Sequence, residues 1–96
     1  MKKYNAKSIV IGRKHKDSKN DDCLRPCFIS LFNVNDPQRK NKAPDKILDF
    51  ENIEKVVIKN LDVSYLLHGN DIVINNLEFI TVKESGSDIE ISGKQV

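Results

Sequence analysis

The chain has 96 residues, of which 39% are hydrophobic and 31% are charged. These proportions describe a soluble globular protein, and a chain of this length folds as one domain with a modest core. No apolar run approaches the roughly 20 residues of a membrane-spanning helix, and the apolar run Ile9–Ile11 is too short for a signal peptide. We therefore expect one cytoplasmic domain over residues 1–96 that does not cross a membrane.

The net charge of +2 conceals a polarised chain. Residues 1–46 hold 12 Lys and Arg against 5 Asp and Glu, whereas residues 47–96 hold 4 against 9. Such asymmetry often marks a binding surface, and it also allows two halves or two copies to attract each other. We expect a basic, loop-rich part over 1–46 and an acidic repeat region over 47–96 within the same domain.

Two strands are expected in the first third of the chain. Ser8–Ile11 is a compact β-branched run that Gly12 follows, and Cys27–Val34 is a second apolar run. Pro26 stands at the start of the second run, where its missing N–H does least harm to a strand ladder. Residues 13–22 contain no apolar residue, which indicates an exposed loop.

The chain has two cysteines, Cys23 and Cys27. A structural zinc site takes four ligands, and only His15 and His68 could complete one with nitrogen. We expect reduced thiols instead, with no metal and no other cofactor. His68 reads as a turn residue, because no nucleophile elbow, phosphate loop or metal-spaced cluster accompanies it. We therefore expect no catalytic residues and no enzyme.

Two basic loops, over residues 12–25 and 37–46, are candidates for binding phosphate groups. Three acidic residues interrupt the first loop, and neither loop carries an aromatic residue on which bases could stack. A solvated loop is the alternative for each. The candidate binding residues are Arg13, Lys14, Lys16, Lys19, Arg39, Lys40 and Lys42.

The segment 47–53 resumes order after the second loop. Its apolar residues Ile47, Leu48, Phe50 and Ile53 fit either a short helical turn or a strand, and the pattern leaves this open. No long helix is expected anywhere, so the domain is predicted to be all-β.

The region from residue 55 onward contains a repeat. The eight residues Val56–Val63 recur sixteen positions later as Ile72–Phe79 with four identities, and a partial copy follows at Ile89–Val96. Each copy opens with a largely β-branched triplet that favours a strand. The apolar positions then change phase, which requires a bend. The predicted left-handed bend residues are Asn60, Asn76 and Gly93.

Two architectures satisfy this repeat. Each copy is either a tight hairpin, which leads to a small β-sandwich or barrel, or one rung of a short parallel β-solenoid. The segments Val56–Leu61 and Asn70–Phe79 resemble the rungs of pectate-lyase-like right-handed β-helices, in which Asn stacks as a ladder in a left-handed bend. This resemblance concerns architecture alone, because no catalytic motif of that family is present.

A second resemblance competes. Ile11–Arg13 near the start, and Leu67–Ile74 with Phe79 near the end, resemble strands of a forkhead-associated sandwich, which implies a phosphothreonine-reading fold. Where that family has a Ser-x-x-His phosphate site, this chain has Arg25–Ile29, without either residue. Phosphopeptide binding is therefore not expected even if the fold is shared.

The pattern favours a non-enzymatic interaction protein that binds another protein through charged loops and an open β edge, as small phage, immunity or inhibitor modules do. One alternative is a nucleic-acid-binding module that uses the basic loops. Another is a structural subunit of a phage fibre or similar assembly. Because the third repeat ends at Val96 without a cap, an open edge there predicts a partner strand or a homo-oligomer.

Overall fold

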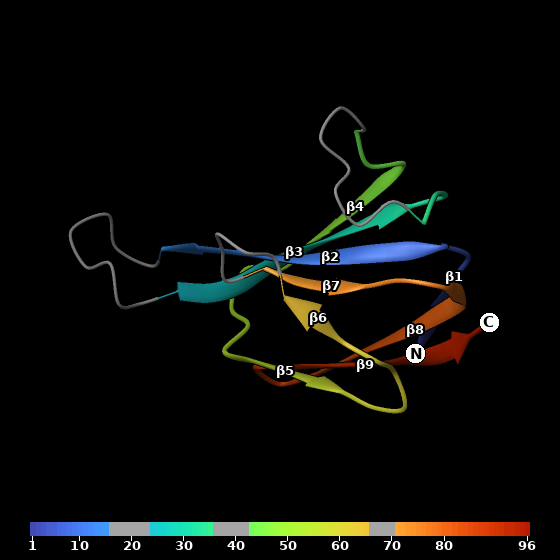
Figure 1. Cartoon of the computed structure of the whole chain (residues 1–96). Coiled ribbons are helices and arrows are strands. Elements are labelled where there is room, and N and C mark those ends of the chain that lie inside the picture. The colour runs from blue at the N-terminus through green and yellow to red at the C-terminus, as the bar shows by residue number, and fades with distance from the viewer. Residues whose placement is uncertain (16–23, 36–42, 66–70) are drawn as a thin grey trace.

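The computed structural model describes residues 1–15, 24–35, 43–65 and 71–96, except for the side chains of residues 13–15, 24–27 and 64–65. Two sheets face each other across the core (Figure 1). No helix occurs in the described residues, so none there could cross a membrane. The all-β class is confirmed, and the structure has the sandwich architecture rather than the solenoid.

The first sheet has four strands in the order β1-β8-β9-β5. Strands β8 and β9 form its central antiparallel hairpin, whose turn contains Gly86 with a φ of 61°. Positive φ is readily available to glycine because it lacks a Cβ atom. The strands are β1 (Lys2–Tyr4), β5 (Lys55–Ile58), β8 (Leu77–Ser85) and β9 (Asp88–Gln95).

The second sheet has five strands in the order β4-β3-β2-β7-β6. Its centre is the long β2–β3 hairpin, in which Gly12 is paired with Phe28. The phenyl ring lies where a side chain at residue 12 would be, so this glycine makes room for the cross-strand aromatic residue. The strands are β2 (Ser8–His15), β3 (Leu24–Phe32), β4 (Lys46–Asp49), β6 (Ser64–Tyr65) and β7 (Ile72–Ile74).

The core lies between the two sheets and consists mainly of β-branched residues. Alternation along each strand sends one set of side chains inward, and those of Ile9, Ile74, Ile80 and Ile91 are fully buried. Burying each such side chain contributes roughly 1.5–3 kcal/mol. The main cluster comprises Ala6, Ile9, Ile11, Ile29, Leu31, Ile53, Ile72, Ile74, Leu77, Ile80, Val82, Ile89 and Ile91.

The repeated segments do not stack as solenoid rungs. The first copy, in β5, belongs to the four-stranded sheet, and the second copy, in β7, belongs to the other sheet. Strand β5 instead pairs in parallel with the third copy, in β9, with Val56 opposite Ile89 and Ile58 opposite Ile91. The solenoid expectation is therefore wrong, because the bend after each of the first two copies takes the chain from one sheet to the other.

Two of the three predicted bend residues adopt the left-handed conformation. Asn60 has a φ of 60° and Asn76 a φ of 59°. Gly93 was expected to share this role but lies within β9, opposite Ile80, without a positive φ. An added Cβ there would stand 2.3 Å from the carbonyl oxygen of Phe79. Glycine is therefore required by the close approach of β8, and the bend prediction for Gly93 is wrong.

One side chain ties the two bends together. The Nε2 group of Gln95 donates a hydrogen bond to the carbonyl oxygen of Asn75 at 2.9 Å. Its Oε1 atom accepts one from the backbone N–H of Asp62, also at 2.9 Å. Gln95 thus braces the chain where it leaves β5 and where it leaves β7.

Two further expectations are settled by the sheets. The segment 47–53 was expected to be either a helical turn or a strand, and its first three residues form a strand as part of β4. The last strand was expected to be an open edge, but β9 lies between β8 and β5. The open edge is therefore not at the C-terminal strand.

Candidate functional site

The end strands of the two sheets lie next to each other on one side of the sandwich. Among the described strands, β1 pairs only with β8, and β4 pairs only with β3, so each keeps one unpaired edge. The ammonium group of Lys46 in β4 lies 5.3 Å from the ring centroid of Tyr4 in β1, within the range of a cation–π interaction. This contact joins the two edges at one end of a groove of about 390 Å³.

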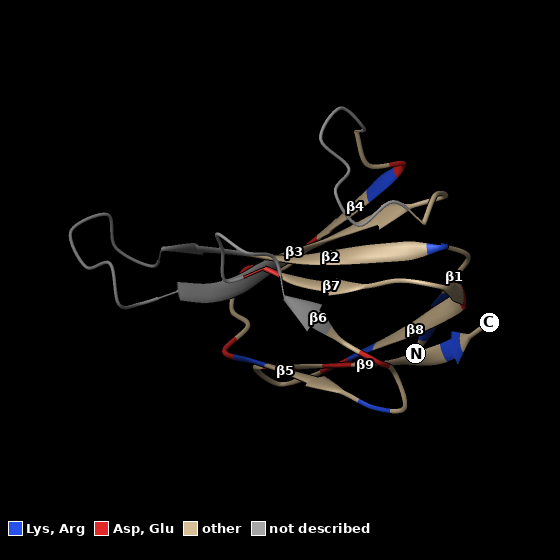
Figure 2. Cartoon of the chain, viewed as in Figure 1, with Lys and Arg blue, Asp and Glu red and all other residues tan. Residues whose placement is uncertain are grey.

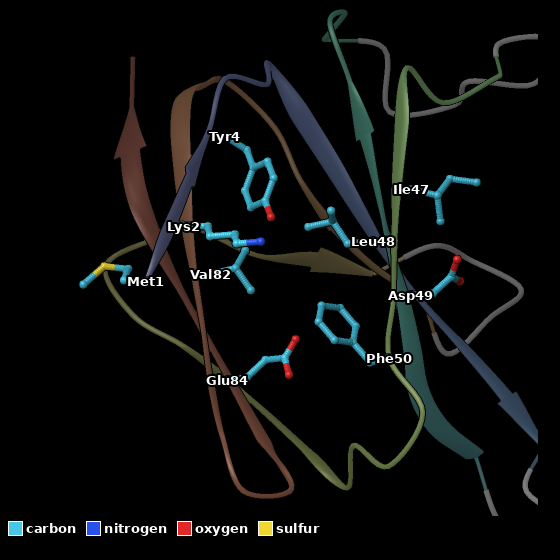
Figure 3. Close-up of a pocket in the computed structure, with 9 residues that line it drawn as sticks. All are labelled: Met1, Lys2, Tyr4, Ile47, Leu48, Asp49, Phe50, Val82 and Glu84. Atoms are coloured by element: carbon cyan, nitrogen blue, oxygen red, sulfur yellow. The ribbon is translucent and has the colours of Figure 1, made fainter.

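Apolar side chains form part of the wall of this groove. Figure 3 shows Tyr4, Leu48, Phe50 and Val82 projecting into it from both sides. Val82 is buried at 7% exposure, and the other three are half-buried and pack against the core cluster. The groove is thus a place where the core reaches the surface between two unpaired strand edges.

The alternation of β4 determines which of its side chains face the groove. Leu48 points inward, whereas Ile47 and Asp49 point to the other side of the strand (Figure 3). Ile47 is 50% exposed there, so β4 carries apolar side chains on both of its faces. Exposed Ile47 on this edge strand is available for contact with another chain, whereas the short length of β4 and its charged ends Lys46 and Asp49 limit pairing without selectivity.

Two charged side chains from the four-stranded sheet line the groove. Glu84 from β8 lies at one end, and Lys2 from β1 lies between Tyr4 and Val82 (Figure 3). A second hollow of about 330 Å³ continues from this end. It is lined by Asp49, Phe50, Glu51, Asn52, Ile53, Glu84 and Gly86. Among the described side chains, no ion pair within 4.0 Å holds Glu84 or Glu51.

The chemistry of the groove suits binding. Among the described residues, those that line the groove include no His, Cys or Ser. In the described part of the chain, His, Cys, Asp and Glu side chains form no group that could hold a metal ion. Half-buried aromatic and aliphatic side chains beside carboxylates such as Glu84 can receive an apolar side chain and a neighbouring cation.

The predicted basic site lies largely outside what the structure describes. Lys16, Lys19, Arg39, Lys40 and Lys42 fall outside the described residues, as do Cys23 and His68. The backbone of Arg13 and Lys14 belongs to β2, but their side chains are not described. Binding by the two basic loops therefore stays a prediction.

Acidic and basic residues both occur along several strands. Figure 2 shows both kinds of residue on the hairpin of β8 and β9 and on β4. Two of the carboxylates are paired: Glu90 with Lys59 at 2.9 Å, and Glu78 with Lys94 at 3.2 Å. Both ion pairs lie within residues 47–96, so they leave the charge difference between the two halves of the sequence unchanged.

The sequence patterns did not indicate the groove. Its residues come from strands that are distant in sequence, and neither Tyr4 nor Glu84 belongs to a recognisable motif. The available signal was the ambiguous segment 47–53, where Ile47, Leu48 and Phe50 place more apolar surface than one strand face can bury.

No protein family, curated protein or solved structure matches the chain in the comparisons with known proteins.

Proposed function

We propose that this protein is a non-enzymatic protein-binding module, and that the groove between β1 and β4 receives an extended segment of its partner. Two observations support this proposal together. Half-buried Tyr4, Leu48 and Phe50 line a groove of about 390 Å³, and the two strand edges that border it lack a partner among the described strands. An extended segment can pair with such an edge while its side chains enter the groove.

The position of the groove along two strand edges supports this proposal over a small-molecule site. The groove runs along β1 and β4 at the surface and is not an enclosed cavity (Figure 3). Backbone N–H and C=O groups at an unpaired edge supply affinity without sequence preference, and side-chain pockets add selectivity. The structure thus offers both components of strand-addition binding in one place.

A displayed library of random peptides, selected on the immobilised protein, tests the proposal. Selected peptides should lose binding to Leu48→Lys, which places a charge in the groove, and retain it with Val63→Lys. Val63 is a matched control because it is 36% exposed and does not line the groove. Circular dichroism and thermal melting would establish that both variants are folded.

Chemical-shift mapping on the unaltered protein provides a measurement that does not depend on a variant. Amide signals of Tyr4, Leu48 and Phe50 should move on addition of a selected peptide. Shifts confined to the outer face of the four-stranded sheet, around Thr81 and Ser92, would show that the peptide binds there and would refute the proposed binding in the groove.

The same protein sample separates this proposal from nucleic-acid binding. Titration with duplex and single-stranded DNA and RNA at two salt concentrations should show no tight, strongly salt-dependent binding. Such binding, together with failure of peptide selection, would favour the basic loops over the groove.

A further inference from the structure

We propose that the segment bound in the groove carries an apolar side chain and, two residues away on the same face, a lysine or arginine. This inference rests on the proposed function and specifies the chemistry of the partner. It follows from the arrangement of the two hollows and from their charges.

The two hollows are adjoining compartments of one groove. Both are lined by Asp49, Phe50 and Glu84, so Phe50 and Glu84 stand at the boundary between them. The first compartment has the apolar wall formed by Tyr4, Leu48 and Val82. The second has a wall in which polar and acidic residues predominate.

The spacing of the compartments suits an extended chain. Successive residues of a strand rise by roughly 3.3 Å, so side chains at positions i and i+2 project to the same face about 6.6 Å apart. Because the compartments share three lining residues, they adjoin. We therefore infer that two side chains on one face of an extended segment occupy them, one in each compartment.

The charge of the second compartment selects a cation. Its lining includes Asp49, Glu51 and Glu84 and no basic residue, and the adjoining compartment adds Lys2 as one positive charge. Glu51 and Glu84 are two carboxylates of this lining that a bound cation would approach. Among the described residues, no side chain holds either of them in an ion pair.

The test uses the peptides selected from the displayed library and synthetic versions of the tightest one. Lysine or arginine should be enriched two positions from an apolar residue. Replacing that basic residue by glutamine should weaken binding to the unaltered protein by roughly two- to fivefold, the range of an exposed ion pair. The loss should shrink at high salt.

A double-mutant cycle assigns the interaction to the acidic compartment. On the variant Glu84→Gln, the difference in affinity between the two peptides should become smaller, because one of the carboxylates that the cation approaches is lost. The matched control Glu78→Gln, which removes a carboxylate of the same strand outside the groove, should leave the difference between the peptides unchanged.

The outcomes distinguish this inference from the proposed function. Peptides that bind the groove without a basic residue, or with an acidic one at that position, overturn the inference and leave the groove function intact. Peptides that bind Leu48→Lys as well as the unaltered protein refute both. Self-association that Leu48→Lys abolishes, with no selected peptide, identifies a second copy as the occupant and overturns the inference.

Discussion

Asn60 and Asn76 share one left-handed backbone conformation, with φ angles of 60° and 59°, and each stands where the chain leaves one sheet for the other. A straight strand cannot do this, because the apolar residues after the bend would face solvent. The bend re-aims them toward the core: Leu77 after Asn76 is buried, and Leu61 after Asn60 packs against the core cluster. The first two copies of the repeat therefore share one structural feature, a left-handed bend at which the chain passes from one sheet to the other.

The conformation at Asn76 predicts which substitutions are tolerated. Asn76→Gly should be nearly neutral, whereas Asn76→Val should destabilise the protein by roughly 1–2 kcal/mol, because a β-branched residue disfavours positive φ. The backbone hydrogen bonds to Asn35 Oδ1 and from the N–H of Val96 do not require the asparagine side chain. Urea unfolding of both variants measures the difference. Equal stability of the two variants would contradict the explanation that the left-handed bend requires Asn or Gly at this position.

Gly93 and Gly86 should respond differently to side chains. Gly93→Ala places a Cβ within 2.3 Å of the carbonyl oxygen of Phe79 and 2.9 Å of the Cα atom of Ile80, so the two strands must separate. We expect a loss of roughly 1–3 kcal/mol. Gly86 has open space around it and a positive φ, so Gly86→Asn should be close to neutral. Thermal melting compares them, and a Gly93→Ala variant as stable as the parent would disprove the steric explanation.

Because Gln95 connects the two bends through two hydrogen bonds, we expect the stability of the protein to depend on both polar atoms of its side chain. Gln95→Ala removes both hydrogen bonds and should lower the free energy of unfolding by roughly 1–3 kcal/mol. Gln95→Glu keeps an acceptor for the N–H of Asp62 but directs an oxygen at the carbonyl oxygen of Asn75, so it should not restore stability. Urea denaturation checks this. Full recovery with glutamate would show that the bond to Asn75 contributes little.

Burial should determine the cost of shortening an isoleucine. Ile91 is fully buried between the sheets, and Ile91→Ala should lose roughly 2–5 kcal/mol, with Ile91→Val losing about 0.5–1.5 kcal/mol. Ile47 is the matched control, since it is 50% exposed, and Ile47→Ala should change stability by no more than about 0.5 kcal/mol. Similar losses of stability at both positions would show that the core has been assigned to the wrong residues.

The ion pair of Glu90 with Lys59 predicts a pH effect. The hydrogen bond and the positive charge of Lys59 hold the pKa of Glu90 below its usual value. A carboxyl group whose pKa falls on folding contributes stability above its unfolded pKa and loses it as pH drops through the folded one. Carbon-detected NMR titration should show the low pKa, and Lys59→Met should raise it. A titration unchanged by that substitution would exclude Lys59 as the cause.

Local sequence patterns predicted parts of β2, β3, β5, β7 and β9 and two of the three bends, but the loop expected over 13–22 was wrong for residues 13–15, which belong to β2. Triplets such as Val56–Ile58 and Ile72–Ile74 favour extended backbone wherever they are placed, and asparagine tolerates positive φ without help from its neighbours. The same reasoning failed at Gly93, because a glycine needed for positive φ and a glycine needed for close packing look identical in a sequence.

Pairing and the groove depended on the tertiary structure. Identical repeats carry no information about which sheet each strand joins, so the parallel pairing of β5 with β9 was not predictable from the repeat. Likewise, Tyr4 and Phe50 come together only because β1 and β4 end their sheets on the same side of the sandwich. Backbone conformation is decided by neighbouring residues in the chain, whereas strand order and surface hollows are decided by packing between segments far apart in it.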